Sequence, residues 1–235
     1  MILRPKQTAG KFKLSAGTLR NYEAKGLVPP AGRSANGYRV YAEEHEAYLA
    51  CIQAMAPAFG MEVTTEVLQC LQRGEWDKAL WTVREKEILL VEDKKRLEAL
   101  TKRLELHAGG RLAYDIENRL TIHEVSKRTG APKSAVRYWE NDGFFTAGRN
   151  PANDYRLYSE AHLLTITLIQ VLQGCVYSED TAALKQSIRA MDHQNADEVL
   201  KLAGQLSRYL NQTLRAQMRA LGALYQLIEL TAPDK

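Results

Sequence analysis

One short pattern occurs twice in this chain, and it limits the possible folds more than any other feature. Residues 18–28 read TLRNYEAKGLV, and residues 135–145 read AVRYWENDGFF. Arg20 and Arg137 stand 117 positions apart, and further pairs keep this offset: Tyr22/Trp139, Glu23/Glu140, Gly26/Gly143, Asn36/Asn153, Tyr38/Tyr155, Arg39/Arg156, Tyr41/Tyr158, Glu43/Glu160 and His45/His162. A duplicated domain explains this match far better than chance.

The second copy predicts a short helix, a turn, a second helix and a β-hairpin. In TIHEVSKRTG, Thr121 and Glu124 form a capping-box pattern and Gly130 ends the helix. The second helix begins at Pro132 or Ser134 and ends before Gly143. The stretch FFTAGRNPANDYRLY, rich in turn-forming residues, then predicts a small hairpin, or wing. These elements predict a winged helix-turn-helix domain.

The first copy is less regular. Lys13 stands where the second copy has Gly130, and the first helix has no clear cap. Its wing has the stronger turn signal, because Asn36-Gly37 favours a two-residue hairpin more than Asn153-Asp154 does.

The two copies resemble the DNA-binding domain of the MerR family of bacterial regulators. That domain typically reads T-aliphatic-R-Tyr-Tyr-E-x-x-G-L and ends its wing with G-Y-R-x-Y, and this chain has TLRNYEAKGLV with GYRVY, and AVRYWENDGFF with DYRLY. The resemblance implies a cytoplasmic, non-enzymatic transcription regulator that binds double-stranded DNA. It also implies a promoter shared with RNA polymerase, DNA distortion, and in some members a small-molecule effector. Nothing in the resemblance points to a membrane.

Side-chain chemistry supports a DNA interface on each copy. Arginine pairs with guanine edges in the major groove, hydroxyl groups reach phosphates or bases, and wing arginines contact the backbone. The predicted DNA-binding residues are Lys13, Ser15, Thr18, Arg20, Tyr22, Arg33, Tyr38, Arg39, Lys133, Ser134, Arg137, Tyr138, Arg149, Tyr155 and Arg156. Other roles remain open: Glu23 and Glu140 pairing with the wings, Tyr22 and Trp139 in the core, and Arg20 and Arg137 in surface ion pairs.

The charge distribution favours the same function and suggests unequal copies. Residues 1–41 carry eight Lys and Arg and one acid, a net charge of +7, which exceeds the +4 of the whole chain. Residues 119–158 carry seven basic and four acidic side chains, a net charge of +3. A concentration of positive charge points to a polyanion such as DNA. The sequence therefore predicts an asymmetric DNA site, or one copy that binds DNA more strongly.

A long helix is predicted after each copy. Between about Trp76 and His107, Val83, Leu90, Leu97 and Leu104 recur every seven residues. Between about Ala196 and Leu230, a second heptad register contains Leu200, Ser207, Leu214, Leu221 and Ile228, with Leu210 and Leu224 beside it. The expected fold is mainly α: two winged helix-turn-helix domains joined by an intramolecular antiparallel coiled coil, a single-chain pseudo-dimer. The expected boundaries are 1–75 for the first domain, 76–108 for its helix, 109–118 for a linker, 119–193 for the second domain and 194–235 for the C-terminal helix. Packing of each helix on its own domain, or dimerisation of the chain, are the alternatives.

Other kinds of site have little support. The sequence has no apolar run long enough to span a bilayer, no catalytic triad and no metal-binding motif, so we expect no enzyme activity, no cofactor and no metal. The three cysteines are expected to be reduced thiols. A rival function is the binding of a drug-like apolar ligand on a MerR-like scaffold, in a pocket beside Phe59, Met61, Trp76, Trp81 and Tyr177. An architectural factor that only bends DNA is a third possibility.

Overall fold

A computed structural model describes residues 5–105 and 119–232 of the chain. The chain divides into two compact units. Unit 1 combines Met1–Ile88 with Gln212–Lys235, and unit 2 is Leu89–Asn211. The predicted linker, residues 109–118, lies outside the described residues, as do the outermost residues of both predicted terminal segments. The five predicted domain boundaries stay a prediction.

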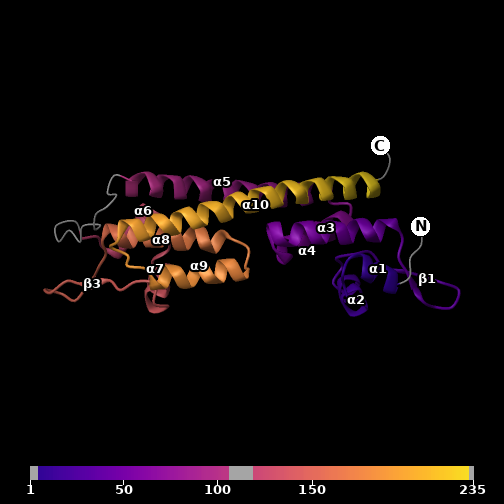
Figure 1. Cartoon of the computed structure of the whole chain (residues 1–235), viewed down its shortest axis with the longest axis horizontal. Coiled ribbons are helices and arrows are strands. Elements are labelled where there is room, and N and C mark those ends of the chain that lie inside the picture. Colours follow the sequence, from indigo (N-terminus) through magenta and orange to yellow (C-terminus); the bar gives the residue numbers. More distant parts are fainter. Residues whose placement is uncertain (1–4, 106–118, 233–235) are drawn as a thin grey trace. The chain divides into compact units, whose positions relative to one another are not determined.

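Unit 1 contains the first winged helix-turn-helix domain (Figure 1). A two-residue antiparallel ladder forms the wing, with Gly32 opposite Val40 and Arg33 opposite Arg39. The elements are α1 (Pro5–Lys11), α2 (Ala16–Ala24), β1 (Gly32–Arg33), β2 (Arg39–Val40), α3 (Glu43–Phe59) and α4 (Met61–Gln72).

Unit 2 repeats this order of elements. In its wing, Gly148 lies opposite Leu157 and Arg149 opposite Arg156. A bridge between Leu120 and Tyr158 also ties the start of the domain to the end of the wing. The elements are α6 (Ile122–Thr129), α7 (Lys133–Asn141), β3 (Gly148–Arg149), β4 (Arg156–Leu157), α8 (Glu160–Gly174) and α9 (Glu179–Ala190).

Two long helices, α5 (Trp76–Glu105) and α10 (Ala196–Thr231), run through both units. Each helix has one segment in unit 1 and one in unit 2. In unit 1, the first turns of α5 pack with the end of α10, where Ala79 and Val83 share a core with Ala220, Leu224 and Leu227. In unit 2, the end of α5 packs with the beginning of α10, where Leu97, Leu100 and Leu104 share a core with Leu202, Leu206 and Leu210. Each unit therefore pairs the two helices antiparallel, as predicted, and the mainly helical fold with two wings is confirmed.

The sequence places the α5 seam correctly and the α10 seam wrongly. Val83, Leu97 and Leu104 are buried and Leu90 is partly buried, as the heptad predicts. On α10, however, Leu214 is 48% exposed, and Leu200, Leu221 and Ile228 are only partly buried. The buried heptad lies one residue earlier and includes Val199, Leu206, Ala220 and Leu227, with Leu210 and Leu224 also in the seam. The prediction fails because α10 carries two adjacent apolar stripes, and the buried one includes small and polar residues.

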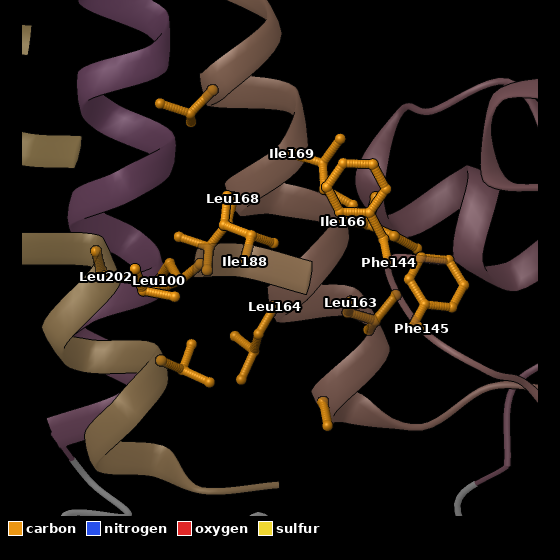
Figure 2. Close-up of a cluster of buried hydrophobic side chains, with 14 of the residues drawn as sticks. Leu100, Phe144, Phe145, Leu163, Leu164, Ile166, Leu168, Ile169, Ile188 and Leu202 are labelled. Atoms are coloured by element: carbon orange, nitrogen blue, oxygen red, sulfur yellow. The ribbon is translucent and has the colours of Figure 1, made fainter. Parts of the chain in front are cut away.

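The core of unit 2 joins residues of all its helices, from α5 to α10, and the segment before the wing. Figure 2 shows Leu100 and Leu202 from the long helices beside Leu164 and Leu168 of α8 and Ile188 of α9. Phe144 and Phe145, which follow α7, pack against the other side of α8. Helix α7 and its unit 1 equivalent α2 are the helices predicted to contact bases, and each is called a reading helix. Val136 and Trp139 of α7 belong to the same core as the apolar residues of the long helices.

The three cysteines are shielded from solvent to different degrees. Cys51 and Cys70 are buried, Cys175 is partly buried, and all three are free thiols. Burial raises the pKa of the Cys51 and Cys175 thiols to about 12. Among the described helices, none combines the length and apolar character that crossing a membrane requires.

A buried carboxylate lies under the C-terminal end of α8. Asp93 of α5 is 6% exposed, and burial is the main cause that raises the pKa of its carboxyl group. Its Oδ1 accepts a hydrogen bond from Arg96, at 3.1 Å. A Cβ atom at Gly174 would overlap the Asp93 carboxylate, so this contact requires glycine.

Gly174→Ala is expected to lower the free energy of unfolding by about 1–3 kcal/mol, because a methyl group must displace the buried carboxylate. Chemical denaturation followed by circular dichroism measures the change. Gly204→Ala on α10 is the matched control: it meets nothing within 4 Å and should be neutral or stabilising. In an Asp93→Ala background the Gly174→Ala loss should shrink. An unchanged loss in that background would show that the clash lies elsewhere.

Candidate nucleic-acid interface

The reading helix of unit 1 begins with a side-chain cap. Ser15 is the N-cap residue of α2, and its Oγ accepts a hydrogen bond from the Thr18 backbone N–H at 2.9 Å. The Ser15 and Thr18 hydroxyl groups also lie 2.8 Å apart and share a hydrogen bond. Two predicted DNA contacts therefore also hold the first turn of the helix. Free N–H groups at a helix N-terminus favour anions such as phosphate.

The reading helix of unit 2 begins differently. Thr121 and Glu124 form the predicted capping box of the preceding helix α6, and Gly130 ends it in a left-handed conformation. Hydrogen bonds from Thr121 lower the pKa of the Glu124 carboxyl group. Helix α7 then starts after Pro132, which offers no side-chain cap. Its first residues, Lys133 and Ser134, are exposed, so the first turn of α7 presents an ammonium group beside a hydroxyl, whereas the first turn of α2 has no ammonium group.

Most predicted contacts lie on exposed surface. Arg20 and Arg137 are exposed at equivalent positions of the two reading helices, and Arg20 Nε donates to the Ala16 carbonyl oxygen at 3.2 Å. The role of Arg20 and Arg137 in binding stays a prediction. Tyr138 is 60% exposed, whereas its neighbour Trp139 is buried at 3% and belongs to the core, as the alternative for that residue predicts. Tyr22 is partly buried and packs on the core of unit 1.

An ion pair ties each reading helix to its wing. Arg39 Nε donates to Glu23 Oε2 at 2.8 Å, and Arg156 Nε donates to Glu140 Oε2 at 2.7 Å. The interpretation of the two glutamates as wing partners is confirmed. The pairing with Glu140 raises the pKa of the Arg156 guanidinium. Because one edge of each guanidinium is occupied, DNA contacts by Arg39 and Arg156, still a prediction, would use the remaining N–H groups.

A histidine fixes the end of each wing. In unit 1, His45 Nδ1 accepts a hydrogen bond from the Ala42 N–H at 3.1 Å; in unit 2, His162 Nδ1 accepts one from the Ser159 N–H at 2.8 Å. Both histidines thereby cap the N-termini of α3 and α8. Burial lowers the pKa of His162, which favours its neutral form. Both histidines are buried, at 6% exposure each, which fits a structural role at the end of each wing.

In each unit, one glutamine that the sequence did not single out stabilises the turn before the reading helix. This contact is called the glutamine brace. Gln53 Nε2 donates to the Phe12 carbonyl oxygen at 2.7 Å, and Gln170 Nε2 donates to the Thr129 carbonyl oxygen at 3.1 Å. Gln53 and Gln170 are 117 positions apart, as are Phe12 and Thr129. The repeat alignment, extended into the third helix, therefore contains the signal for these two glutamines.

The wings carry exposed aromatic and basic side chains. Tyr38 is 71% exposed and Tyr155 is 72% exposed. Arg33 donates to the Gly37 carbonyl oxygen at 3.0 Å and Arg149 to the Asp154 carbonyl oxygen at 3.1 Å, so each arginine lies across its own turn. Tyrosine and arginine side chains of this kind contact DNA phosphates in many complexes.

Two segments of the chain match known protein families by sequence. A family described as "MerR family regulatory protein" matches residues 4–41, and one described as "MerR HTH family regulatory protein" matches residues 120–178. Each unit therefore contains a segment that matches a MerR-type regulatory domain. MerR-type domains are those of DNA-binding transcription regulators.

Several transcription regulators are similar to part of the chain. "HTH-type transcriptional regulator CueR" of Salmonella typhimurium is 27% identical over 108 residues, 43% of this chain and 78% of the relative. The protein of the same name from Escherichia coli O157:H7 is also 27% identical, over 80% of its length. "HTH-type transcriptional regulator AdhR" of Bacillus subtilis is 34% identical over 91 residues, 39% of this chain and 62% of the relative. No solved structure gives a significant match.

The residues named for the expected ligand pocket are divided between unit 1 and unit 2, and the pocket stays a prediction. Phe59 belongs to the core of unit 1, Trp76 packs on that core, and Trp81 is 67% exposed. Met61 borders a groove of unit 1, and Tyr177 borders a groove of about 270 Å³ in unit 2. Large apolar residues recur through helical packing, so their presence in sequence did not identify a cavity. No group of metal-ligating side chains occurs in residues 5–105 and 119–232.

The two MerR-type copies keep the same backbone at two turns while the residue changes. Lys13 has a φ of 53° where Gly130 has 72°, and Asp154 has a φ of 57° where Gly37 has 77°. Positive φ is strained for residues other than glycine. The first copy thus has glycine at the wing turn and a strained lysine between its first two helices. The second copy has glycine between its first two helices and a strained aspartate at the wing turn.

Lys13→Gly is expected to stabilise the protein by about 1 kcal/mol, because glycine adopts a positive φ without strain. Lys13→Ala is the matched control, since it removes the same ammonium group but keeps the strain. If Lys13 contacts DNA, both variants should lower DNA affinity alike while only Lys13→Gly raises stability. Thermal unfolding and DNA titration separate the two effects. Equal stability of the two variants would contradict the strain argument.

Proposed function

We propose that one chain reads two dissimilar half-sites of an asymmetric or pseudo-palindromic promoter site, using one winged helix for each. One observation supports this most directly: the two copies share their internal contacts but differ in what their reading helices expose. The ion pair, the histidine cap and the glutamine brace recur in both units. Two domains that keep the same internal contacts but expose different side chains are suited to bind two different DNA half-sites.

The differences lie where base contacts are made. The first turn exposes a serine cap in unit 1 and Lys133 with Ser134 in unit 2. The residue after the reading arginine is Asn21 in unit 1 and Tyr138 in unit 2. Arginine selects guanine, asparagine selects adenine, and tyrosine adds bulk and a hydroxyl group. We expect half-sites that share a guanine and differ in the neighbouring bases.

A single chain with two readers avoids a restriction of homodimers. Two identical subunits must read a palindrome, because symmetry gives both half-sites the same side chains. Two unequal domains in one chain have no such restriction. The difference in charge between residues 1–41 and 119–158 further suggests that unit 1 contributes more of the phosphate affinity.

By family resemblance, we infer that binding distorts a promoter in the cytoplasm and changes its use by RNA polymerase. Bending a short site costs several kcal/mol, roughly 1–6, which contacts to phosphates must offset. The exposed arginines and tyrosines of both wings provide such contacts. A small-molecule effector remains part of this proposal.

A second candidate function is the binding of an apolar small molecule. Its support is the groove of unit 2, which Tyr138, Trp139, Phe144 and Tyr177 line, with Tyr177 87% exposed. Quenching of tryptophan fluorescence by an aromatic ligand, in protein without any salt-sensitive DNA affinity, would favour this candidate over DNA reading.

Selection from random duplex DNA is expected to enrich a site with two unlike halves. Arg20→Ala should relax selection in one half and Arg137→Ala in the other, each at a cost of about 1–3 kcal/mol in affinity. Sequencing of the selected pools measures this. Arg208→Ala, an exposed arginine of α10 outside both reading helices, is the control and should select the same site as the wild type.

Three outcomes differ in meaning. If only one half-site is enriched and only one arginine matters, the other domain is scaffold. If the halves are identical, the copies read alike despite their different surfaces. Absence of any enriched sequence would contradict the proposed function.

A further inference from the structure

A groove in unit 2 borders the reading helix α7. Its floor is apolar, because Trp139 of α7, Phe144 just after that helix and Ile169 of α8 are all buried. Phe144 lies beside Ile169 in Figure 2. The volume of the groove is about 270 Å³, close to the lower end of the roughly 300–1,000 Å³ typical of small-molecule sites. A molecule of one or two rings fits this space, which is called the α7 groove.

Two exposed tyrosines stand at the rim of the α7 groove. Tyr138 of α7 is 60% exposed, and Tyr177, in the loop before α9, is 87% exposed. The backbone around Tyr177 is held in place, because the Val176 carbonyl oxygen accepts a hydrogen bond from the Tyr209 hydroxyl at 2.9 Å and Ser178 caps α9. Aromatic rings prefer offset-stacked or edge-to-face contacts with other rings. Exposed tyrosines above an apolar floor therefore favour a flat aromatic ligand.

Positive charge is in excess at one side of the α7 groove. Asp142 Oδ2 lies 2.5 Å from Arg189 Nη2 and 3.4 Å from Lys185 Nζ. The contact with Arg189 is the main cause that lowers the pKa of the Asp142 carboxyl group. One carboxylate thus faces two cations. Arg189 also lies over the Phe144 ring, 4.8 Å from its centroid, whereas Lys185 has the longer ion pair and a side chain that is 44% exposed. The ammonium group of Lys185 therefore has N–H donors left for an anion.

The equivalent groove of unit 1 has the opposite character. Glu62 and Glu66 line it together with Lys25, so negative charge is in excess there. Four positions at the offset of 117 residues differ between the two grooves: Asn21/Tyr138, Lys25/Asp142, Leu27/Phe144 and Gly60/Tyr177. Unit 1 thus lacks three of the four aromatic side chains of unit 2 and the excess of positive charge. An aromatic anion is expected to bind unit 2 and not unit 1.

We propose that the α7 groove binds a small planar aromatic carboxylate. The rings lie between Tyr138 and Tyr177, above Phe144, and the carboxylate pairs with Lys185. This ligand class is narrower than the apolar molecule of the second candidate function, and binding here accompanies DNA reading instead of replacing it.

The ligand regulates one reading domain only, a consequence that rests on the proposed function. Tyr138 is a rim residue of the α7 groove and also a predicted DNA contact. A ligand stacked on Tyr138 takes this side chain from the DNA, so it weakens the hold of unit 2 on its half-site and leaves unit 1 unaffected. By linkage, the same DNA half-site weakens ligand binding by the same factor. Two identical subunits would respond alike, so this selective response requires the difference between the copies.

Calorimetric titration of the full chain with 2-naphthoate, in the absence of DNA, tests the site. We expect one molecule per chain, with a Kd of about 10–100 µM. The matched probe is 2-naphthamide, which keeps the rings and lacks the charge. It should bind roughly tenfold more weakly, because the charge-assisted contact with Lys185 is lost. Absence of 2-naphthoate binding, or equal binding of the two probes, overturns the proposal.

Two substitutions locate the ligand in the α7 groove. Tyr177→Ala should weaken 2-naphthoate binding roughly tenfold through loss of ring contact. Lys185→Gln should weaken binding of 2-naphthoate and leave binding of 2-naphthamide unchanged. Tyr225→Ala is the control, because Tyr225 is a similarly exposed tyrosine, at 62%, on α10. Circular dichroism confirms that each variant is folded. If neither groove substitution changes the Kd, the probe binds elsewhere and the proposal is wrong.

Footprinting on the selected DNA site tests the regulation. At saturating 2-naphthoate, protection should fall in the half-site whose selection depends on Arg137 and persist in the half-site that depends on Arg20. Tyr177→Ala should protect the site as the wild type does and lose the response to 2-naphthoate. Equal loss from both halves, or an unchanged footprint, contradicts regulation of one reading domain. The calorimetry contains no DNA, so absence of any selected DNA site would contradict the proposed function and leave the ligand site standing.

Discussion

The ion pair between each reading helix and its wing is the contact on which the DNA-binding surfaces depend. A two-residue ladder has too few hydrogen bonds to fix a wing by itself. Glu23 and Glu140 hold the wing arginines at 2.8 Å and 2.7 Å, and the pairs are partly shielded from solvent. Exposed ion pairs contribute little to stability, but partly buried ones with short hydrogen bonds fix geometry. The helix that enters a groove and the wing that contacts the backbone are thereby kept in one arrangement.

Duplication followed by divergence accounts for what the two units share and where they differ. Internal contacts that define the domain recur in both units at the offset of 117 residues. They include contacts that no sequence motif predicts, such as the glutamine braces. The turns recur as well, even where Lys13 and Asp154 adopt a strained backbone. On the exposed face of the reading helices, Arg20 and Arg137 are kept, whereas Asn21 is replaced by Tyr138. Selection for two functions of the same kind on one scaffold produces this pattern.

The sequence predicted the elements whose signals are local. The capping box at Thr121 and Glu124, the wing turns and the α5 heptad could be read directly, because each depends on neighbours in the chain. The buried stripe of α10 could not be predicted, since Leu214 and Leu221 make the more apolar heptad while Ala220 and Gln217 are the residues that are buried. Which stripe is covered depends on partners from α5 and the domain core. The exposure of the residues named for the ligand pocket could not be predicted for a similar reason: Phe59, Trp81 and Tyr177 have the chemistry of a pocket, but tertiary packing sets how exposed each of them is.

The central claim is that a single chain reads both halves of one DNA site. Attachment of a DNA-cleaving chelate to the wings tests it directly, using Asn36→Cys in unit 1 and Ala152→Cys in unit 2, both of which are exposed. The native thiols are buried or partly buried, so labelling should favour the new cysteines. On the selected site, the unit 1 label should cut one end only, and the unit 2 label should cut the opposite end only. If either label cuts both ends equally, two copies bind the site symmetrically and the account of a single-chain reader is wrong.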